Sequence, residues 1–560
     1  MQRTLLAVAL SAGLAALPAY AETPKLIVQI TVDQLRADLL TRYAQHFSDQ
    51  GFNYLLKQGV VFHEAHHEHA ITETVVGHAT LATGAHPAQH GMVSNLWFDR
   101  LQQAPAYNVE DANYPLIGSS AGVDKANEID PTQKAANSDG RSPANLLGST
   151  FGDELVAHYA GQSRVFAVSV KDRGAITMAG HAGKAFWFSK KNGEFVSSRF
   201  YYPDYPSWVS QWNQANPASR YANTDWQLSK PASAYLLGQR DKQSWELALP
   251  GFGNTFPHAF GPADSRLFTT LLTLSPVADE FTADFAKTLI DNNKLGQGKA
   301  PDYLAISFSA TDYVGHVFGP SSLEAEDNLL RLDRTLADLF SHIDQQVGLS
   351  NTLIVLSADH GAPEAPGYLK QYGAQARYID IKGLEAQPPL RALKKRLGIS
   401  GKLFGNAWQP YLNLDRDAVA QSKLSLTELS QHVVSALNET SGIYRAYSHA
   451  ELLSGAIPND AVTRKVQNSF YPQRSGDIYV VFQPNSFVND FDGLAVASVH
   501  GSPWRYDTHV PVIFAGNGLK TANVHRPIAT VDVAPTLSAI LGINAPSNAV
   551  GQALPEVLSQ

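Results

Sequence analysis

The 560-residue chain contains no cysteine. Disulfide bonds, thiolate catalysis and cysteine-ligated zinc are therefore excluded, which leaves histidine and aspartate as the strong metal ligands. Long runs of basic residues are also absent, and the formal net charge is −8 at pH 7. A mildly acidic chain of this kind gives no reason to expect nucleic acid or an anionic membrane as a partner.

Long apolar runs are equally scarce. Beyond residue 21, no stretch reaches the roughly 18 consecutive apolar residues that a membrane-spanning helix needs. Residues 1–21 combine a basic start at Arg3 with a short apolar run, broken by Pro18, and end in Ala19-Tyr20-Ala21. This pattern predicts a secretory signal peptide that is cut after Ala21. We therefore expect a periplasmic or secreted protein with no membrane attachment after cleavage.

Short, almost continuous apolar runs are present instead, and they are typical of buried parallel strands. Four of them lie at residues 25–32, 164–170, 303–309 and 352–357. Helix-compatible segments follow, such as the amphipathic stretch 323–347. The alternation predicts an α/β fold with a doubly wound, mostly parallel central sheet and helices on both faces.

The segments between these runs indicate one large domain with insertions. Residues 101–150 are polar and suit a surface excursion, residues 203–260 are rich in Trp, Tyr, Pro and Ser without a clear period, and residues 365–490 mix helical runs with loops. We therefore expect a signal peptide at 1–21 and a catalytic domain at 22–560, in which these three segments are insertions or caps.

Polar residues follow each of the four predicted strands. Because the carboxyl ends of parallel strands meet at one edge of a sheet, these side chains can converge there. Asp312 and His316, four apart, would share one face of a helix, as two ligands of one ion do. Taken singly, Asp33 could be only a helix cap, and the Lys171–Arg173 pair could be a solvated turn. The converging candidates are Asp33, Lys171, Arg173, Asp312, His316, Asp359, His360 and, near the end of the chain, His500.

The stretch 71–100 offers a candidate nucleophile. Small residues from Gly77 to Thr80 suit a helix N-terminus that lies close to a sheet, where free backbone N–H groups attract an anion. The hydroxyl of Thr74 would face that anion. The alternative is that Thr72 and Thr74 simply cap the helix.

Four histidines just before this stretch, His63, His66, His67 and His69, resemble a metal cluster at first sight. Their spacing fits neither a metalloprotease helix nor a zinc knuckle, and a strand would distribute their rings over both faces. We do not expect them to bind a metal together.

A charge count indicates the class of substrate. The nitrogen and oxygen ligands at the strand ends suit two zinc ions with three protein ligands each. Two Zn²⁺ against three aspartates leave +1, and Lys171 with Arg173 brings the site to +3. A dianionic phosphate monoester is favoured there over a neutral ester, with Thr74 as the nucleophile.

The order of these motifs is similar to that of a known family. It runs Asp33, Thr74-x-x-Gly77-His78-Ala79, Asn95, Lys171-x-Arg173, Asp312-x-x-x-His316, Asp359-His360-Gly361, His500-Gly501. The set resembles the alkaline phosphatase superfamily over residues 25 to 545. It looks most like the bacterial phosphate-irrepressible branch with a threonine nucleophile, which is close to the nucleotide pyrophosphatase/phosphodiesterases.

The resemblance implies a role for each residue. One zinc would be held by Asp312, His316 and His500, and the other by Asp33, Asp359 and His360 with the Thr74 oxygen. Asn95, Lys171 and Arg173 would contact the phosphoryl oxygens. His500 is preferred to His509 because it carries the family's His-Gly signature. The implied activity is hydrolysis of small phosphate monoesters through a phosphothreonine intermediate.

Other functions remain as alternatives. A phosphodiesterase or nucleotide pyrophosphatase could use the same scaffold, and a zinc-binding protein without turnover would leave Thr74, Asn95, Lys171 and Arg173 without a role. A sulfatase is disfavoured, because the residue that matures to formylglycine is absent. The sequence selects neither a leaving group nor an oligomeric state.

Overall fold

The computed structural model describes residues 23–100, 102, 104–118, 125, 128–408, 410–491 and 493–558. The predicted signal peptide, residues 1–21, lies outside the described residues. Within them, no helix is both long enough and apolar enough to cross a membrane.

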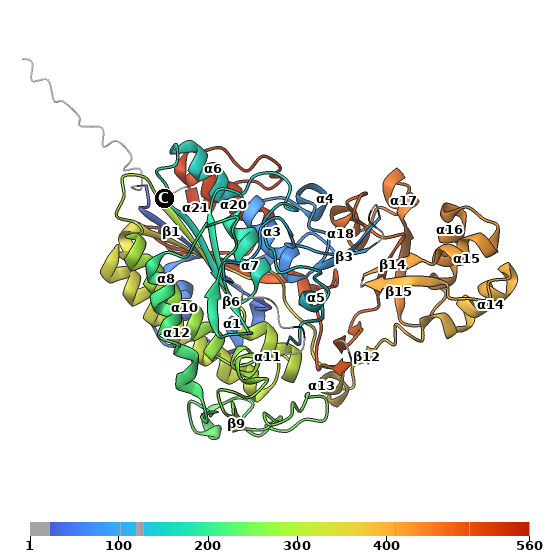
Figure 1. Cartoon of the computed structure of the whole chain (residues 1–560), viewed down its shortest axis with the longest axis horizontal. Helices are drawn as coiled ribbons and strands as arrows, with labels where there is room; N and C mark the ends of the chain where they lie inside the picture. Colours follow the sequence, from blue (N-terminus) through green and yellow to red (C-terminus); the bar gives the residue numbers. More distant parts are fainter. Residues whose placement is uncertain are drawn as a thin grey trace, which may run out of the picture.

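A sheet of ten strands, counted over the described residues, forms the centre of the molecule (Figure 1). Its middle consists of four adjacent parallel strands: β11 (Thr352–Ser357), β1 (Leu26–Val32), β10 (Asp302–Phe308) and β5 (Val165–Ser169). These are the four strands that the apolar runs predict. Because they are neighbours and parallel, their carboxyl ends lie side by side at one edge of the sheet.

The outer strands complete the sheet. On one side, β20 (His509–Gly516) is antiparallel to both β11 and β2 (Val60–His66), and β2 also pairs in parallel with β21 (Ala522–Val524) and β22 (Ile528–Ala529). On the other side, β6 (Lys184–Ser189) is parallel to β5 and forms a hairpin with β7 (Glu194–Val196). The sheet is therefore mostly parallel, as predicted.

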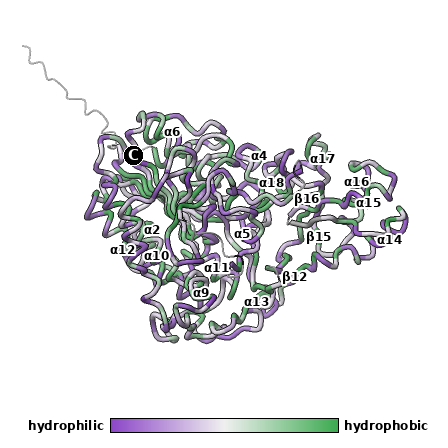
Figure 2. Tube along the Cα trace, viewed as in Figure 1, coloured by the Kyte–Doolittle hydropathy of each residue, from purple (hydrophilic) through white to green (hydrophobic). Residues whose placement is uncertain are grey.

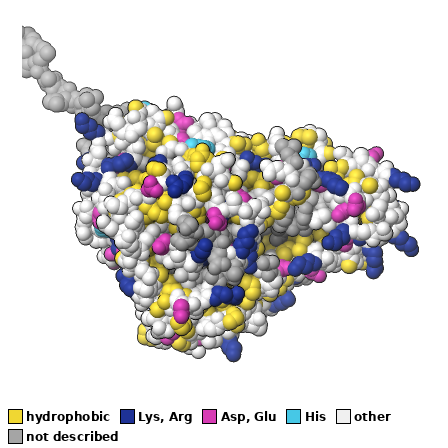
Figure 3. Space-filling model, in the orientation of Figure 1, with side chains coloured by type: hydrophobic (Ala, Val, Ile, Leu, Met, Phe, Trp, Pro, Cys, Tyr) yellow, Lys and Arg dark blue, Asp and Glu magenta, His cyan; other side chains and the backbone are white. Residues whose placement is uncertain are grey.

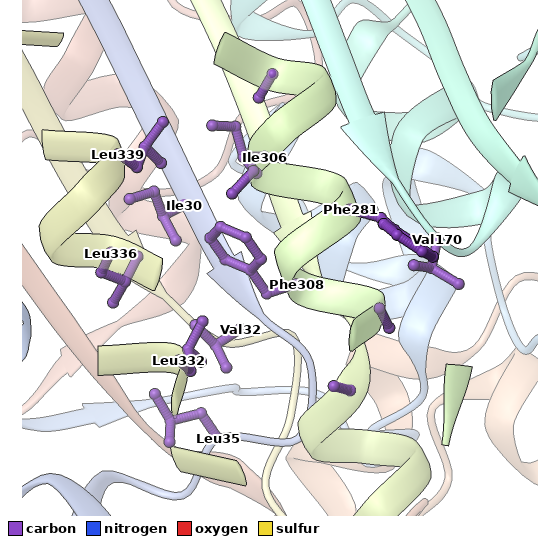
Figure 4. Packing of buried hydrophobic residues seen from close by; sticks show 14 of the residues in the cluster. Ile30, Val32, Leu35, Val170, Phe281, Ile306, Phe308, Leu332, Leu336 and Leu339 are labelled. Carbon is purple, nitrogen blue, oxygen red and sulfur yellow. The ribbon is translucent and has the colours of Figure 1, made fainter. Parts of the chain in front are cut away.

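Helices cover both faces of the sheet, which confirms the predicted fold class. Alternate residues of β1 explain this, since Val28 and Ile30 join one apolar core and Ile27 joins the other. Figure 4 shows Ile30 and Val32 packed against leucines of a helix on the first face, and Figure 2 shows the strands as the most hydrophobic part of the trace. The first face carries α1 (Ala37–Arg42), α2 (Phe52–Gln58), α10 (Val277–Asn293) and α12 (Leu323–Gln346). The second carries α3 (Thr74–Thr83), α6 (Phe151–His158), α7 (Asp172–Ala179), α20 (Val533–Leu541) and α21 (Pro555–Leu558).

A smaller antiparallel sheet lies beside the main body, in orange at the right of Figure 1. Its strand order is β13 (Phe404–Trp408), β14 (Tyr411–Leu414), β16 (Ile478–Phe482), β15 (Ile443–Ser448). Together with α14 (Pro388–Leu397), α15 (Arg416–Ser422) and α16 (Leu426–Asn438) it encloses an apolar core of its own. A further apolar cluster, which includes Val75 of α3 and Tyr479 of β16, joins this subdomain to the central fold.

Shorter elements connect these layers. They are β3 (Leu96–Asp99), β4 (Ala104–Tyr107), α4 (Pro87–His90), α5 (Pro131–Lys134), α8 (Ser207–Gln214), β8 (Asp225–Trp226), β9 (His258–Ala259), α9 (Phe268–Thr273), α11 (Ala310–Phe318), α13 (Pro366–Gln371), β12 (Arg377–Tyr378), α17 (His449–Ser454), α18 (Ala461–Ser469), β17 (Ser486–Phe487), β18 (Asp490–Phe491), β19 (Leu494–Ala495) and α19 (Arg505–Thr508). On the face seen in Figure 3, basic and acidic side chains are interspersed over the surface.

Candidate active site

Thr74 is the first residue of α3 and is buried at the end of the central strands. The helix approaches the sheet closely at Gly77, where a Cβ atom would lie only 1.9 Å from the backbone oxygen of Asp359. The prediction of a helix N-terminus packed tightly against the sheet is therefore confirmed. Two cations meet the Thr74 hydroxyl: Lys171 Nζ and Arg173 Nη2 donate to its Oγ1 at 3.4 and 3.5 Å.

Lys171 also contacts two of the predicted ligands. Its ammonium lies 2.7 Å from Asp33 Oδ2 and 2.5 Å from Asp312 Oδ2, and all three side chains are buried. Arg173 pairs at 2.8 Å with Asp130, a residue of the segment before α5. Lys171 thus connects the candidate nucleophile with Asp33 and Asp312, whereas Arg173 connects it with Asp130.

Three histidines at the site share one arrangement. The Nδ1 atoms of His316, His360 and His500 lie 2.7, 3.0 and 2.6 Å from backbone carbonyl oxygens. A carbonyl oxygen can only accept, so each Nδ1 carries the hydrogen and each Nε2 of the neutral ring has a free lone pair. Histidines that bind metals are commonly fixed in their tautomer in this way.

The free Nε2 atoms face carboxylates. His316 and His500 place Nε2 at 3.1 and 3.4 Å from Asp312 Oδ1, and His360 places it at 3.5 Å from Asp33 Oδ1. Asp359 Oδ2 is 3.4 Å from the same His360 atom. Lone pairs that face carboxylates at this distance repel each other unless a cation or proton lies between them.

Two of the three groups of potential metal ligands among the described residues lie at this site. One consists of Asp312, His316 and His500, and the other of Asp33, Asp312 and His360. Oδ1 of Asp33, Oδ2 of Asp359 and Nε2 of His360 are buried without a hydrogen-bond partner, and Oδ2 of Asp33 meets only the Lys171 ammonium. Buried acceptors without donors are costly, and a divalent cation satisfies several of them at once. The residues therefore fit a metal centre.

The carboxylates differ in the direction of their pKa shifts. Burial, together with the negative charges of Asp312 and Asp359, raises the pKa of Asp33 well above its ordinary value. For Asp312, burial acts in the same direction, but His316 and Lys171 outweigh it and hold the pKa well below the usual range. The site thus contains more negative charge than Lys171 alone can balance, which favours additional cations.

Asn95 lies beside the N-terminus of α3. Its Oδ1 accepts the backbone N–H of Val75 at 3.0 Å, which fixes the amide so that Nδ2 is directed to donate elsewhere. Glu73, the N-cap residue just before α3, accepts from the Asn95 backbone N–H at 2.5 Å and from Ser94 Oγ at 2.9 Å. Glu73 therefore positions Asn95.

A cavity of about 560 Å³ opens onto these residues. Its polar side includes Asn95, Arg173, Asp312, His316 and His500. Its apolar side comes largely from the smaller subdomain and the β18–β19 hairpin, with Tyr411, Leu412, Val480, Phe482, Phe491 and Leu494. The site can therefore hold an anionic group at the strand ends and an organic group against the apolar side.

Several residues of the site have no sequence signal of their own. Gln34, whose backbone is left-handed at φ +67°, donates Nε2 to Asp312 Oδ1 at 2.7 Å and its N–H to Asp359 Oδ1 at 3.1 Å. In the sequence, only its position directly after Asp33 indicates that it lies near the site. Asp130 precedes a proline in a polar segment, which indicates a helix cap rather than a partner of Arg173.

The four upstream histidines do not gather into one cluster. His67 and His69 are buried and hydrogen-bonded to each other at 3.1 Å, and His63 stacks on His525 at the surface. His66 joins Glu64 and His509 in a possible metal group. Arg505, however, already contacts Glu64 at 2.9 Å and His66 at 3.2 Å. His509 is thus placed in this group, and His500 is placed at the strand ends.

The fold and the site define an α/β protein with a candidate metal centre and a buried hydroxyl at the carboxyl ends of its parallel strands. The chain belongs to the type I phosphodiesterase/nucleotide pyrophosphatase family, whose sequence profile matches residues 27–503. Within the alkaline phosphatase superfamily, it is similar to bacterial enzymes over nearly its full length. Alkaline phosphatase PhoV of Synechococcus elongatus is 32% identical over 540 residues, which cover 96% of this chain and 93% of the relative.

A second relative, alkaline phosphatase PafA of Elizabethkingia meningoseptica, is 32% identical over 545 residues, 96% of this chain and 95% of the relative. The crystal structure of wild-type PafA superimposes with a TM-score of 0.84 at 31% identity and covers 96% of this chain and 99% of its own. A crystal structure of a PafA variant, in which a threonine, an asparagine, a lysine and an arginine are substituted, superimposes with a TM-score of 0.83 at 31% identity. It covers 95% of this chain and 99% of its own.

Proposed function

We propose that the protein is an exported, metal-dependent alkaline phosphatase that hydrolyses phosphate monoesters through a phosphothreonine intermediate. The observation that carries this proposal is the position of Thr74 Oγ1, at a helix N-terminus and within 3.5 Å of both Lys171 Nζ and Arg173 Nη2. A hydroxyl between two buried cations, beside a group of buried carboxylates, suits attack on a dianionic phosphoryl group. The curated relatives named alkaline phosphatases support the same function.

The ligand set supports two zinc ions per chain. When bound, such ions lower the pKa of a coordinated hydroxyl and neutralise charge on the phosphoryl group and the leaving oxygen. Histidine and carboxylate donors without thiolates suit zinc. The residues that would hold the two ions are Asp312, His316 and His500 for one, and Asp33, Asp359 and His360, with Thr74, for the other.

The protein's own groups carry the two chemical steps. Thr74 Oγ attacks phosphorus, the P–O bond to the leaving alcohol breaks, and the alcohol takes up a proton. Water then attacks the phosphothreonine, which releases inorganic phosphate and restores the threonine hydroxyl. The backbone N–H groups that begin α3, the Asn95 amide, Lys171 and Arg173 stabilise the charge on the equatorial oxygens in both steps. Two inversions give net retention at phosphorus.

The PafA variant adds support for these assignments. Its four substituted residue types, a threonine, an asparagine, a lysine and an arginine, recur in the same order here as Thr74, Asn95, Lys171 and Arg173. These are the four residues of this chain that we assign to the nucleophile and to phosphate binding.

A phosphodiesterase is the second candidate, because the family's description includes that activity. The deciding experiment compares kcat/KM for 4-nitrophenyl phosphate and methyl 4-nitrophenyl phosphate, which share a leaving group. We expect the monoester to be preferred by roughly 10²-fold or more, since Lys171 and Arg173 favour the dianion. A preference for the diester would reverse the assignment.

The metal content and the cellular location of the protein need separate tests. We expect two zinc ions per chain by elemental analysis, with activity lost on chelation and restored by zinc. An enzyme that is fully active with magnesium alone would contradict the zinc assignment. Fractionation of producing cells should recover the mature chain, beginning after Ala21, outside the cytoplasm.

A further inference from the structure

The short helix α19 contacts the loops that carry His360 and His500. It follows the His500 loop in the chain and precedes strand β20. Its backbone touches the loop after His360 directly, because a Cβ atom at Gly361 would lie only 2.2 Å from the backbone oxygen of Tyr506. No residue of α19 has a role in the proposed phosphatase reaction.

Asp507 of α19 is hydrogen-bonded to both loops, and it is 1% exposed. Its backbone oxygen accepts the N–H of Gly361, the residue after His360, at 2.8 Å. Its side-chain Oδ2 accepts the backbone N–H of Ser502 at 2.9 Å and the Ser502 hydroxyl at 2.5 Å. Ser502 lies two residues after His500. One buried residue thus connects two loops that each carry a proposed metal ligand.

The two histidines are in direct contact at the site. The imidazole rings of His360 and His500 are stacked, with their centres 3.6 Å apart and an angle of 20° between their planes. Nε2 of His360 lies 3.5 Å from Asp33 Oδ1, in one proposed ligand group. Nε2 of His500 lies 3.4 Å from Asp312 Oδ1, in the other. A shift of the His500 loop therefore changes the distance between the two groups as well as the geometry of its own group.

The His500 loop depends on contacts with other segments, because it belongs to no helix or strand. Gly501 has a left-handed φ of +117°, and a Cβ atom there would meet no other atom within 4 Å. Thr72 supplies two contacts: its backbone oxygen accepts His500 Nδ1–H at 2.6 Å, and its hydroxyl donates to the Ser502 carbonyl at 3.0 Å. Asp507 holds the same loop from the side of α19.

We infer that Asp507 is a positioning residue, which sets the spacing between His360 and His500 and holds His500 in the orientation that a metal ligand needs. It acts through Ser502 and Gly361 rather than at the reacting atoms. Removal of a group that holds a metal ligand in place typically lowers metal affinity by roughly 10- to 100-fold. The inference rests on the proposed function, since it requires that His500 bind a metal.

Zinc titration of an alanine variant tests this role. Asp507→Ala removes the acceptor for Ser502 but keeps the backbone oxygen that binds Gly361. In zinc-buffered solution, we expect one of its two zinc ions to half-saturate at a free zinc concentration roughly 10- to 100-fold above the wild-type value. The affinity for the other ion should change far less. Saturating zinc should restore most of kcat, because the ligands themselves are intact.

Two further variants separate positioning from general stability. Asp507→Asn keeps an oxygen that can accept from Ser502, so it should bind zinc almost as the wild type does. Asp333→Ala is the matched control: Asp333 is 2% exposed, and its oxygens accept the N–H groups of Phe52 and Ser48 at 2.8 and 2.7 Å. This control should lower the melting temperature without changing zinc affinity.

If Asp507→Ala does not fold, Ser502→Ala takes its place. It removes only the hydroxyl that donates to Asp507, and it should weaken the binding of one zinc ion by roughly 3- to 10-fold. Unchanged zinc affinity in the folded variant, beside a wild type that binds two ions, would overturn the inference and leave the proposed function intact. Equal shifts in the Asp507→Ala and Asp333→Ala variants would overturn it as well. A wild-type protein that binds no zinc would contradict the proposed function and the inference together.

Discussion

The two sides of the cavity are built on opposite principles. On one side, short loops at the ends of four parallel strands and the N-terminus of α3 present charged groups, and several of their buried polar atoms have no hydrogen-bond partner. On the other side, the antiparallel subdomain and the β18–β19 hairpin present apolar side chains such as Val480 and Phe491. The subdomain is stabilised by an apolar core of its own.

This difference assigns chemistry and selection to different parts of the fold. Charged groups must keep their positions to within a fraction of an ångström during catalysis, and a central sheet covered on both faces provides that rigidity. Apolar contacts tolerate small shifts and act mainly through the area they bury. Mutations on the polar side should therefore affect turnover of every substrate, and mutations on the apolar side should affect only some.

The largest effect is expected for Thr74. Thr74→Ala removes the nucleophile and should lower kcat by roughly 10³-fold or more. The melting temperature should change little, because the hydroxyl accepts only two long hydrogen bonds. Thr74→Ser retains a hydroxyl and should keep part of the activity. A Thr74→Ala enzyme with substantial turnover would show that another group attacks phosphorus.

The two cations come next. Replacing both Lys171 and Arg173 by alanine should reduce monoester turnover by roughly 10²- to 10⁴-fold, at about 1.5–3 kcal/mol for each charge-assisted hydrogen bond. The diester carries less charge and should lose far less. Metal content must be measured in parallel, since Lys171 also pairs with Asp33 and Asp312. Equal losses of turnover on the monoester and the diester would indicate that Lys171 and Arg173 have a structural role only.

Glu73 should have a smaller effect that acts through Asn95. Glu73→Gln weakens the acceptor for the Asn95 backbone N–H and should lower kcat/KM about tenfold, the equivalent of one charged hydrogen bond. A double-mutant cycle tests the route, because the loss should largely disappear in an Asn95→Ala background. Additive losses would mean that Glu73 acts independently of Asn95.

The smallest effect is expected on the apolar side. Phe491 lines the cavity, and its ring centre lies 4.7 Å from that of His316. Phe491→Ala should lower kcat/KM for phenyl phosphate by roughly 3- to 10-fold, through lost apolar contact. Methyl phosphate, which does not reach this side, should be hydrolysed almost as before. A uniform loss on both substrates would indicate that the ring instead holds His316 in place.

The same division explains what the sequence could predict. Strands β1, β5, β10 and β11 are buried on both faces, so they are continuous apolar runs that need no knowledge of their neighbours. These runs also predict Asp33, Asp312 and Asp359 as candidate site residues, because each comes shortly after a strand end, which can be read from the local sequence. The i, i+4 relation of Asp312 and His316 on α11 is local as well.

Contacts between distant segments could not be predicted in this way. Asp130 reaches Arg173 across a polar stretch that has no periodic pattern, and Glu324 meets His258 only because an irregular segment returns to the start of α12. The antiparallel direction of β20 also depends on the path of the chain rather than on the strand's own residues. The contacts of Lys171 with Asp33 and Asp312 join side chains from three different strand ends, so no local pattern predicts them.

The close contact at Gly77 limits which substitutions this protein can accept during evolution. Any other residue at position 77 would force α3 away from the Asp359 backbone by about 1.5 Å, from 1.9 Å to the 3.4 Å of ordinary contact. Displacements of about 1 Å at a reacting group can cost roughly 10²-fold in rate. The spacing between the threonine hydroxyl and the aspartate is thus set by two backbones in contact, with no side chain available to adjust it. A residue without any functional group should therefore tolerate as little substitution as the nucleophile three positions before it, and a saturation library at position 77 should yield active clones with glycine alone.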